Sequence, residues 1–177
     1  MEQDHWSTRD QAATLISSIC HQYGKSYHTL QPRIAKALLR AFLDPTKPLT
    51  TQYGAIKGLS QLGTEVTRVL VVPNIKFYSD NCLQYALNST NAFKSEGANK
   101  CKEALVDILL QVGKESSKSS LDRQSSTGTD TLMSDGESAS EDDRTALLEH
   151  VGPIIGKAFM EIDNSKTSVQ GILEIFS

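Results

Sequence analysis

The sequence predicts an all-α fold, a short α-solenoid of stacked helix pairs, on three observations. Apolar residues recur at three- and four-residue steps through most of the chain, which is typical of amphipathic helices. Proline and glycine separate these segments at short intervals, as they do at helix ends. Strand signals are poor, because the one β-branched cluster, 69–72, lies inside a helical period. The 177 residues suffice for one domain with a sizeable core.

The first two helices are predicted over 7–23 and 28–43. Ser7, with Asp10 three residues later, forms a capping-box pattern, and Gly24 supplies a helix end that tolerates positive φ. Pro45 and Pro48 end the second helix, because proline lacks an amide donor and restricts its predecessor. In the first helix we expect a buried apolar stripe made of Ala12, Leu15, Ile16, Ile19 and Tyr23. The second is expected to bury Leu30, Ile34, Ala37, Leu38, Ala41 and Phe42.

Three further helical segments are predicted before residue 114. The third helix is capped by Thr50 or Thr51, ends at Gly63, and is expected to bury Tyr53, Ile56, Leu59 and Leu62. A fourth starts at Glu65 with Val66, Val69 and Leu70 facing inward. Pro73 interrupts it, and a helix carrying Phe77, Cys82 and Leu83 resumes there. The fifth is marked by Ala98, Cys101, Leu105, Ile108, Leu109 and Val112.

An internal repeat emerges when the chain is shifted by 43 residues. Ser7 then falls on Thr50, Ala12 on Ala55 and Ile16 on Leu59, so caps and apolar stripe register together. A period of about 40–47 residues holding a helix pair is typical of the HEAT and armadillo class. One pair cannot cover its own apolar face, so neighbouring pairs stack. We therefore expect a HEAT-like repeat domain over 1–113, with a weak third copy because Asn99 and Lys102 stand where apolar residues belong.

Residues 114–143 are predicted to be a disordered, acidic, serine-rich linker. Helical periodicity stops there, and residues 115–143 hold eight acids against two basic residues. Such a composition cannot bury enough apolar area to offset the entropy of ordering. Acids three residues after serine favour phosphorylation at Ser134, Ser138 and Ser140, which would let the linker compete for a basic face. Beyond it, 144–177 is predicted to be a C-terminal helical segment able to dock on the solenoid.

Composition and motifs exclude several classes. No apolar run approaches a membrane span, and no secretion signal opens the chain. Cys20, Cys82 and Cys101 have no metal or disulfide spacing and suit buried positions in a reducing compartment. The histidines are scattered singly, with no phosphate-binding loop or nucleophile elbow. We expect no enzyme, no cofactor, no metal and no small-molecule substrate. An unrecognised Cys/His enzyme is the least favoured alternative.

Two surface features admit both a structural and a functional interpretation. Arg33, Lys36 and Arg40 form a basic helix face, either ordinary solvated surface or a contact for an acidic protein. Aromatic content of 6% argues against nucleic-acid binding. Gly54 and Gly58 make a flat strip on one helix. It favours either the close approach of a neighbouring helix or a shallow groove for a partner segment.

Two stretches, 5–13 and 43–63, resemble a known family. It is the C-terminal HEAT-repeat domain of transcription initiation factor TFIID subunit 6, a TBP-associated factor, most closely the plant-type members. Members of this family share a tryptophan before an R-D-x-A motif, a helix with the pattern Y-G-[AS]-I-x-G-L-x-x-L-G, and a proline one turn after the next helix. The resemblance covers 5–87, and the matching positions are Trp6, Arg9, Asp10, Ala12, Tyr53, Gly54, Ile56, Gly58, Leu59, Leu62, Gly63 and Pro73.

The resemblance implies a nuclear, non-enzymatic scaffold subunit of TFIID, working at RNA polymerase II promoters through contacts with other TFIID subunits. Relatives also serve SAGA-type coactivators. It points to Trp6, Arg9, Asp10, Tyr53, Gly54 and Gly58 for structural or contact roles. Trp6 and Tyr53 would anchor packing at the heads of successive helices, and Arg9 and Asp10 would pair locally or contact another subunit. The alternative is a HEAT-type transport or phosphatase adaptor that binds acidic client segments through Arg33, Lys36 and Arg40.

Overall fold

The computed structural model of the chain describes residues 5–124 and 138–176, with side chains described outside 117–124. Every regular element among these residues is helical, which confirms the predicted all-α fold. The helices are α1 (His5–Tyr23), α2 (Leu30–Leu43), α3 (Leu49–Gln61), α4 (Thr64–Val66), α5 (Ile75–Tyr78), α6 (Gln84–Leu87), α7 (Ala92–Gln124), α8 (Glu141–Val151), α9 (Pro153–Ile162) and α10 (Lys166–Leu173). Shorter helical turns join α4 to α6.

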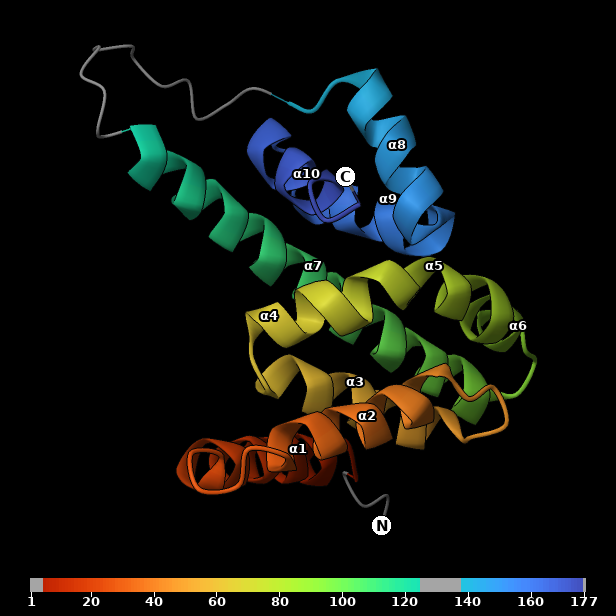
Figure 1. The fold of residues 1–177 in the computed structure, drawn as a ribbon. Helices are drawn as coiled ribbons and strands as arrows, with labels where there is room; N and C mark the ends of the chain where they lie inside the picture. The colour runs from red at the N-terminus through yellow and green to blue at the C-terminus, as the bar shows by residue number, and fades with distance from the viewer. Residues whose placement is uncertain (1–4, 125–137, 177) are drawn as a thin grey trace.

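The helices form one stack, with the α1–α2 hairpin at one end and α8, α9 and α10 at the other (Figure 1). α3 lies inside the stack, packed against α1 and α2 on one side and α7 on the other. α7 continues the stack to α9 and α10, while α5 contacts α8. One core therefore runs through the whole HEAT-like stack, from Ala35 and Phe42 in α2 to Ile172 in α10.

The two halves of the predicted repeat, α1 and α3, lie against each other as neighbouring helices. Ala13 and Ile56, which the 43-residue shift aligns, are both buried. The Ser17 hydroxyl donates a 2.6 Å hydrogen bond to the Gln61 carbonyl, which fastens the end of α3 to α1. α7 packs on the far side of α3 with Ala98 and Cys101 buried, so the weakly predicted third copy occupies the third place in the row.

The segment 64–87 is one irregular helical rod in which two π-helical turns, Thr67–Val71 and Ser79–Leu83, alternate with α and 3₁₀ turns. One row of its buried side chains recurs every fourth residue, at Thr67, Val71, Ile75, Ser79 and Leu83, and Val72, Tyr78, Cys82 and Ala86 are buried beside it. A regular α-helix of 3.6 residues per turn would rotate such a row away from the core, and the wider π turns absorb that drift. The predicted inward position of Val69 is wrong, since this side chain is 66% exposed, and Phe77 is 51% exposed.

The predicted buried stripe of the first helix is also wrong. α1 buries Ala13 and Cys20, whereas Leu15, Ile19 and Tyr23 are exposed. The buried side chains are thus the small ones, and the larger apolar ones lie on a side of α1 that no helix among the described residues covers. In α2, the predicted inward Ala37 is exposed while Phe42 is buried.

Helix ends follow the predicted signals in part. Gly63 ends α3 with φ +115°, and Gly152 separates α8 from α9 with φ +84°, a region that glycine enters without strain. Gly24 does not adopt positive φ, contrary to prediction. α1 already includes His5, so Ser7 lies in its first turn and is not the N-cap.

The linker boundaries need correction. The predicted disordered segment 114–143 is helical as far as Gln124, and its last residues, from Glu141, belong to α8. The Glu115 carboxylate accepts a 2.7 Å hydrogen bond from the Thr64 hydroxyl, and the buried Ser116 hydroxyl donates one of 3.3 Å to the Gly171 carbonyl. These long-range contacts hold α7 in place where its apolar period has ended. Residues 125–137, the middle part of the predicted linker, lie outside the described residues.

The C-terminal helices α8, α9 and α10 pack on α5 and α7. Close approach of α10 to α7 depends on small residues: a Cβ at Gly113 would lie 3.1 Å from the Ser168 Cβ, and none fits at Gly171 beside Ser116. Asp163 holds the turn before α10 by accepting hydrogen bonds from the Ser165 and Ser168 hydroxyls. Although burial opposes it, these bonds lower the pKa of that carboxyl from its ordinary value.

Candidate functional site

The motif residues of α1 and α3 meet at one joint between neighbouring helices. The Tyr53 hydroxyl donates a hydrogen bond of 2.9 Å to Asp10 Oδ1. Trp6 packs edge-on against the Tyr53 ring, with centroids 5.0 Å apart and planes at 78°. The indole Nε1 of Trp6 donates to Glu96 Oε1 at 3.2 Å, which adds α7 to the contact. We call Trp6, Asp10, Tyr53 and Glu96 the α1–α3–α7 joint.

The joint combines apolar and polar contacts. Edge-on aromatic pairs are favourable beyond the area that they bury, so the Trp6–Tyr53 pair fixes the entry of both helices. Burial, followed by the hydrogen bond to Asp10, raises the pKa of Tyr53 above its ordinary value. The phenol therefore remains a neutral hydrogen-bond donor, and the contacts of the joint connect α1 to α3 and α7.

The glycine strip of α3 faces two different neighbours. A Cβ at Gly54 would lie 3.7 Å from Arg9 Nη1 of α1, an ordinary contact. A Cβ at Gly58 would lie 2.9 Å from Leu38 Cδ1 of α2, which is too close without movement. Helices occupy both sides of the strip, as the packing interpretation requires. Arg9 forms no ion pair with described residues, and its buried Nε has no hydrogen-bond partner.

A second, fully buried polar cluster joins α3 to the 64–87 rod. The Tyr78 hydroxyl donates a 2.8 Å hydrogen bond to Gln52 Oε1, and Gln52 Nε2 donates to the Asp44 carbonyl at 2.9 Å. Cys101 Sγ of α7 donates to the Leu49 carbonyl at 3.5 Å. Burial raises the pKa of the Cys101 thiol to about 12, so the thiol stays protonated. This cluster ties the turn before α3 to α5 and α7.

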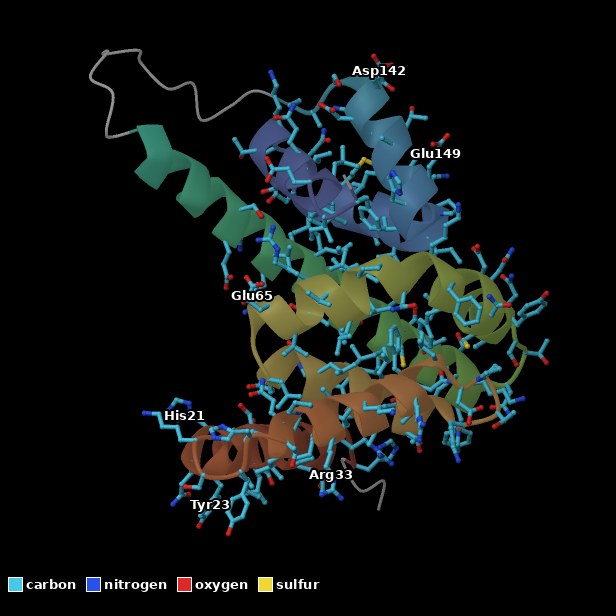
Figure 2. All side chains as sticks on the ribbon, viewed as in Figure 1. His21, Tyr23, Arg33, Glu65, Asp142 and Glu149 are labelled. Atoms are coloured by element: carbon cyan, nitrogen blue, oxygen red, sulfur yellow. The ribbon has the colours of Figure 1, made fainter. Side chains whose placement is uncertain are left out.

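The predicted basic face lies on α2. Arg33, Lys36 and Arg40 are exposed, and no ion pair within the described part of the chain engages them. Arg33 projects from the hairpin at the N-terminal end of the stack (Figure 2). The structure thus separates this face from the joint, whose residues lie between α1, α3 and α7.

Ser138 and Ser140, two of the predicted phosphorylation sites, lie beside α8, toward the opposite end of the molecule from α2 (Figure 1). Ser140 is the N-cap of α8, where its hydroxyl accepts a 3.1 Å hydrogen bond from the Asp143 amide. Ser138 is exposed and pairs with Ser165 in the isolated bridge. Ser134 lies outside the described residues. Phosphorylation at Ser138 and Ser140 stays a prediction.

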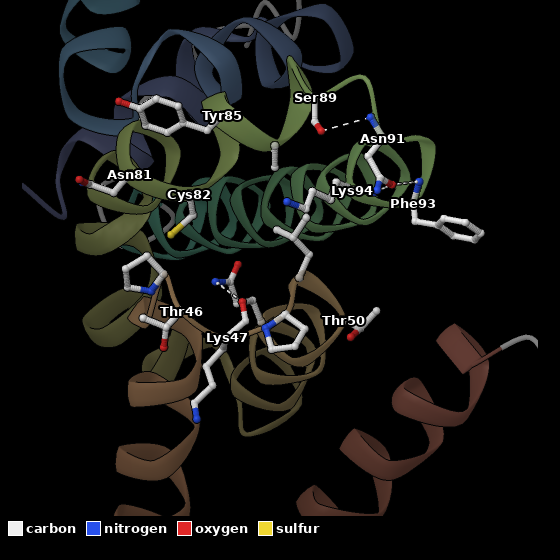
Figure 3. A pocket seen from close by; sticks show the side chains of 15 residues that line it. Thr46, Lys47, Thr50, Asn81, Cys82, Tyr85, Ser89, Asn91, Phe93 and Lys94 are labelled. Atoms are coloured by element: carbon white, nitrogen blue, oxygen red, sulfur yellow. Dashed lines mark hydrogen bonds between the residues drawn. The ribbon is translucent and has the colours of Figure 1, made fainter.

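A groove of about 710 Å³ runs between the 44–48 turn, α6 and the start of α7 (Figure 3). Tyr85 and Phe93 at its rim are 76% and 78% exposed, and Lys47 and Lys94 are its charged lining residues. Cys82 also lines the groove, and its thiol could in principle act as a nucleophile. Burial raises the pKa of that thiol, which disfavours the reactive thiolate. The groove offers surface for contact and no activated nucleophile.

Residues with metal-ligating side chains are dispersed over 5–124 and 138–176: no three of them come together as a metal site requires. None of the helices described over those ranges is both apolar and long enough to cross a bilayer. Cys20, Cys82 and Cys101 are buried and free, which confirms the prediction made for them.

Sequence reasoning missed Glu96, Gln52 and Tyr78. Gln52 is 1% exposed, although a glutamine between Thr51 and Tyr53 gives no sign of burial. Its partner Tyr78 is 26 residues away along the chain, so no local pattern could have joined them. Glu96 lies in the first part of α7, 90 residues from Trp6.

Comparisons with known proteins bear out the resemblance. Residues 1–76 match the family described as the TAF6 C-terminal HEAT repeat domain. The chain is 49% identical over 107 residues to the SAGA complex/transcription factor TFIID complex subunit Taf6 of Schizosaccharomyces pombe, covering 60% of this chain and 24% of that protein. It is 45% identical over 101 residues to transcription initiation factor TFIID subunit 6 of Arabidopsis thaliana, covering 57% of this chain and 18% of the relative.

A more distant relative is TFIID subunit 6 of Drosophila melanogaster, 33% identical over 87 residues, which are 49% of this chain and 14% of the relative. The matches therefore span about a quarter or less of these relatives' own length. No solved structure matches the chain. Trp6, Arg9, Asp10, Tyr53, Gly54 and Gly58 all lie within the matched residues 1–76.

Proposed function

We propose that this chain is a scaffold segment of TFIID-type and SAGA-type transcription complexes. One observation carries the proposal: residues 1–76 match the TAF6 C-terminal HEAT repeat domain, and the matched motif residues Trp6, Asp10 and Tyr53 fall in the α1–α3–α7 joint. In this proposal the motif maintains the shape of the stack, and the exposed helix faces bind other subunits. The chain acts in the nucleus, during assembly of the RNA polymerase II preinitiation complex, without catalysing a reaction.

The chemistry of the described residues supports a binding role. The thiols of Cys82 and Cys101 are held protonated by burial, and the groove between the 44–48 turn, α6 and the start of α7 is lined by lysines, hydroxyls and exposed aromatic rings. Extended surfaces made by stacked helix pairs are the usual binding sites of solenoid proteins. The relatives named above are described as subunits of transcription complexes, which favours a TFIID scaffold over a transport or phosphatase adaptor.

The test is affinity purification of the tagged chain from nuclear extract, with bound proteins identified by mass spectrometry. We expect other TFIID subunits to be recovered. Recovery of importins or phosphatase subunits without TFIID subunits would contradict the proposal and favour the adaptor.

A matched pair of variants sharpens this experiment. Trp6→Ala removes the aromatic contact of the joint, whereas Phe93→Ala removes a side chain that is 78% exposed on α7. If the motif maintains the stack, Trp6→Ala lowers both the thermal stability and the recovery of TFIID subunits, while Phe93→Ala leaves the stability unchanged.

A further inference from the structure

The outward side of the α1–α2 hairpin carries an exposed apolar stripe that no element in the described part of the chain covers. Leu15, Ile19 and Tyr23 are 61%, 38% and 46% exposed. Spaced four residues apart, they follow one another along one side of α1, whose buried residues are Ala13 and Cys20. Tyr27, 65% exposed, continues the apolar surface into the turn before α2.

Single exposed apolar side chains are normal, but a continuous row of them marks a contact surface. Leu15, Ile19 and Tyr23 therefore form the kind of surface that a further helix would cover.

Between Asp10 and Asp44, the same hairpin carries only positive charge. Between Asp10 and Asp44 the sequence contains no acidic residue, but it contains Lys25, Arg33, Lys36 and Arg40, in a chain whose net charge is −3. Arg33, Lys36 and Arg40 follow one another at helical spacing on an exposed side of α2. Tyr23 of the apolar stripe and Arg33 of the basic row both project from the free end of the stack (Figure 2). We call Leu15, Ile19, Tyr23, Arg33, Lys36 and Arg40 the hairpin face.

We propose that the hairpin face binds an acidic amphipathic helix of a partner protein. The apolar side chains of that helix would cover Leu15, Ile19 and Tyr23, and its carboxylates would lie against Arg33, Lys36 and Arg40. A helix that docks in this way presents apolar anchors at three- and four-residue spacing, which matches the four-residue spacing of the stripe. The proposal rests on the proposed function, since it supplies the class of partner for one surface of the scaffold.

Charge decides among the possible occupants. A second copy of this chain would place the same positive residues opposite each other across a symmetric contact, which is repulsive. A nucleic acid would pair its phosphates with the arginines and lysine, but its charged backbone would leave Leu15 and Ile19 without an apolar partner. An acidic amphipathic helix satisfies both parts of the face at once.

The experiment uses a labelled synthetic peptide of about 18 residues, long enough to form a helix, with leucines at helical spacing and glutamates elsewhere. Its control has the same composition with the leucine spacing scrambled, and a labelled DNA duplex serves as the competing class of ligand. Binding to the full chain is measured by fluorescence anisotropy at low and high salt. We expect saturable binding of the helical peptide, weaker binding of the scrambled one, and weakening of both by salt.

Two variants locate the binding surface. Because each exposed charge pair contributes little, R33E/K36E/R40E is expected to weaken peptide binding about tenfold in total. Leu15→Ser with Tyr23→Ser weakens it at unchanged charge. The matched control K76E/K94E/K157E reverses three exposed lysines outside the hairpin face and leaves the affinity within about twofold. Circular dichroism checks that each variant keeps its helical content, which exposed substitutions should preserve.

Three results would overturn the proposal: peptide affinity unchanged by R33E/K36E/R40E, equal binding of helical and scrambled peptides, or tight binding of the duplex with none of the peptide. Concentration-dependent dimerisation abolished by Leu15→Ser with Tyr23→Ser would also overturn it, in favour of a second copy. None of these measurements involves TFIID subunits. Failure here would therefore leave the purification from nuclear extract to decide the proposed function separately.

Discussion

α1 and α3 come from the two halves of one sequence repeat, yet they bury very different surfaces. In α3 the buried residues are Gln52, Tyr53, Ala55, Ile56, Gly58 and Leu59, whereas α1 buries Ala13 and Cys20. Both helices carry apolar residues at helical spacing. The difference lies in their neighbours, because α3 is enclosed by α1, α2 and α7, whereas no helix among the described residues covers the side of α1 that bears Leu15, Ile19 and Tyr23. Equivalent patterns produce equivalent helices, and position in the stack decides which side chains leave water.

The largest expected effect comes from one substitution made in each helix. Leu59 is fully buried and Leu15 is 61% exposed. Leu59→Ala is expected to lower the free energy of unfolding by about 2–5 kcal/mol, because it removes buried contacts and leaves a cavity. Leu15→Ala should change it by less than about 0.5 kcal/mol. Urea titration followed by circular dichroism measures both, and similar losses for the two variants would show that α1 is covered as α3 is.

The buried polar cluster beside α3 makes the protein sensitive to alkaline pH. The pKa of the Cys101 thiol rises from 9.0 to about 12 on folding, so the folded state retains a proton that the unfolded chain releases above pH 9. The contribution of this thiol to stability is complete below pH 9 and falls at about 1.4 kcal/mol per pH unit up to pH 12.

The control for this prediction is Cys101→Ala, which removes the titrating group. Denaturant titrations at pH 8, 9, 10 and 11 should give a shallower loss of stability for the variant than for the parent chain. Equal slopes would mean that the thiol does not keep its proton on folding.

The hydrogen bonds donated by the Tyr53 and Tyr78 hydroxyls should contribute differently to stability. Tyr78→Phe leaves Gln52 Oε1 buried without its donor, which is expected to lower stability by about 1–3 kcal/mol. Tyr53→Phe removes the bond to the partly exposed Asp10, which water can replace, and should lower it by about 1 kcal/mol. Thermal unfolding of both variants provides the comparison. A larger loss for Tyr53→Phe would show that the joint on the α1 side is the tighter of the two.

The smallest effect distinguishes the α1-facing and α2-facing sides of α3. Gly54→Ala introduces a methyl group at ordinary contact distance from Arg9, so the better helix propensity of alanine should stabilise the chain by about 1 kcal/mol. Gly58→Ala needs Leu38 to move and should yield no such gain. Differential scanning calorimetry of the two variants tests this prediction. An equal gain in stability would mean that Leu38 of α2 moves aside without cost.

The basic face of α2 and the α1–α3–α7 joint show how far the sequence could predict the candidate site. Arg33, Lys36 and Arg40 lie on one side of a helix whose apolar residues recur clearly at three- and four-residue steps, so their exposure was predictable. The convergence of Trp6, Tyr53 and Glu96 was not, because it joins three helices through contacts of up to 90 residues in separation.

The sequence by itself determined the all-α class, the helix ends at Gly63 and Gly152, and the 43-residue register of α1 and α3. These features depend on local physics: side-chain periodicity, and the backbone freedom of glycine. Only the tertiary structure decided that Leu15, Ile19 and Tyr23 remain exposed, that α7 continues to Gln124, and that Gln52 is buried. The burial of a side chain depends on which distant helix packs against it, and a periodic pattern states which residues share a face without stating which face is covered.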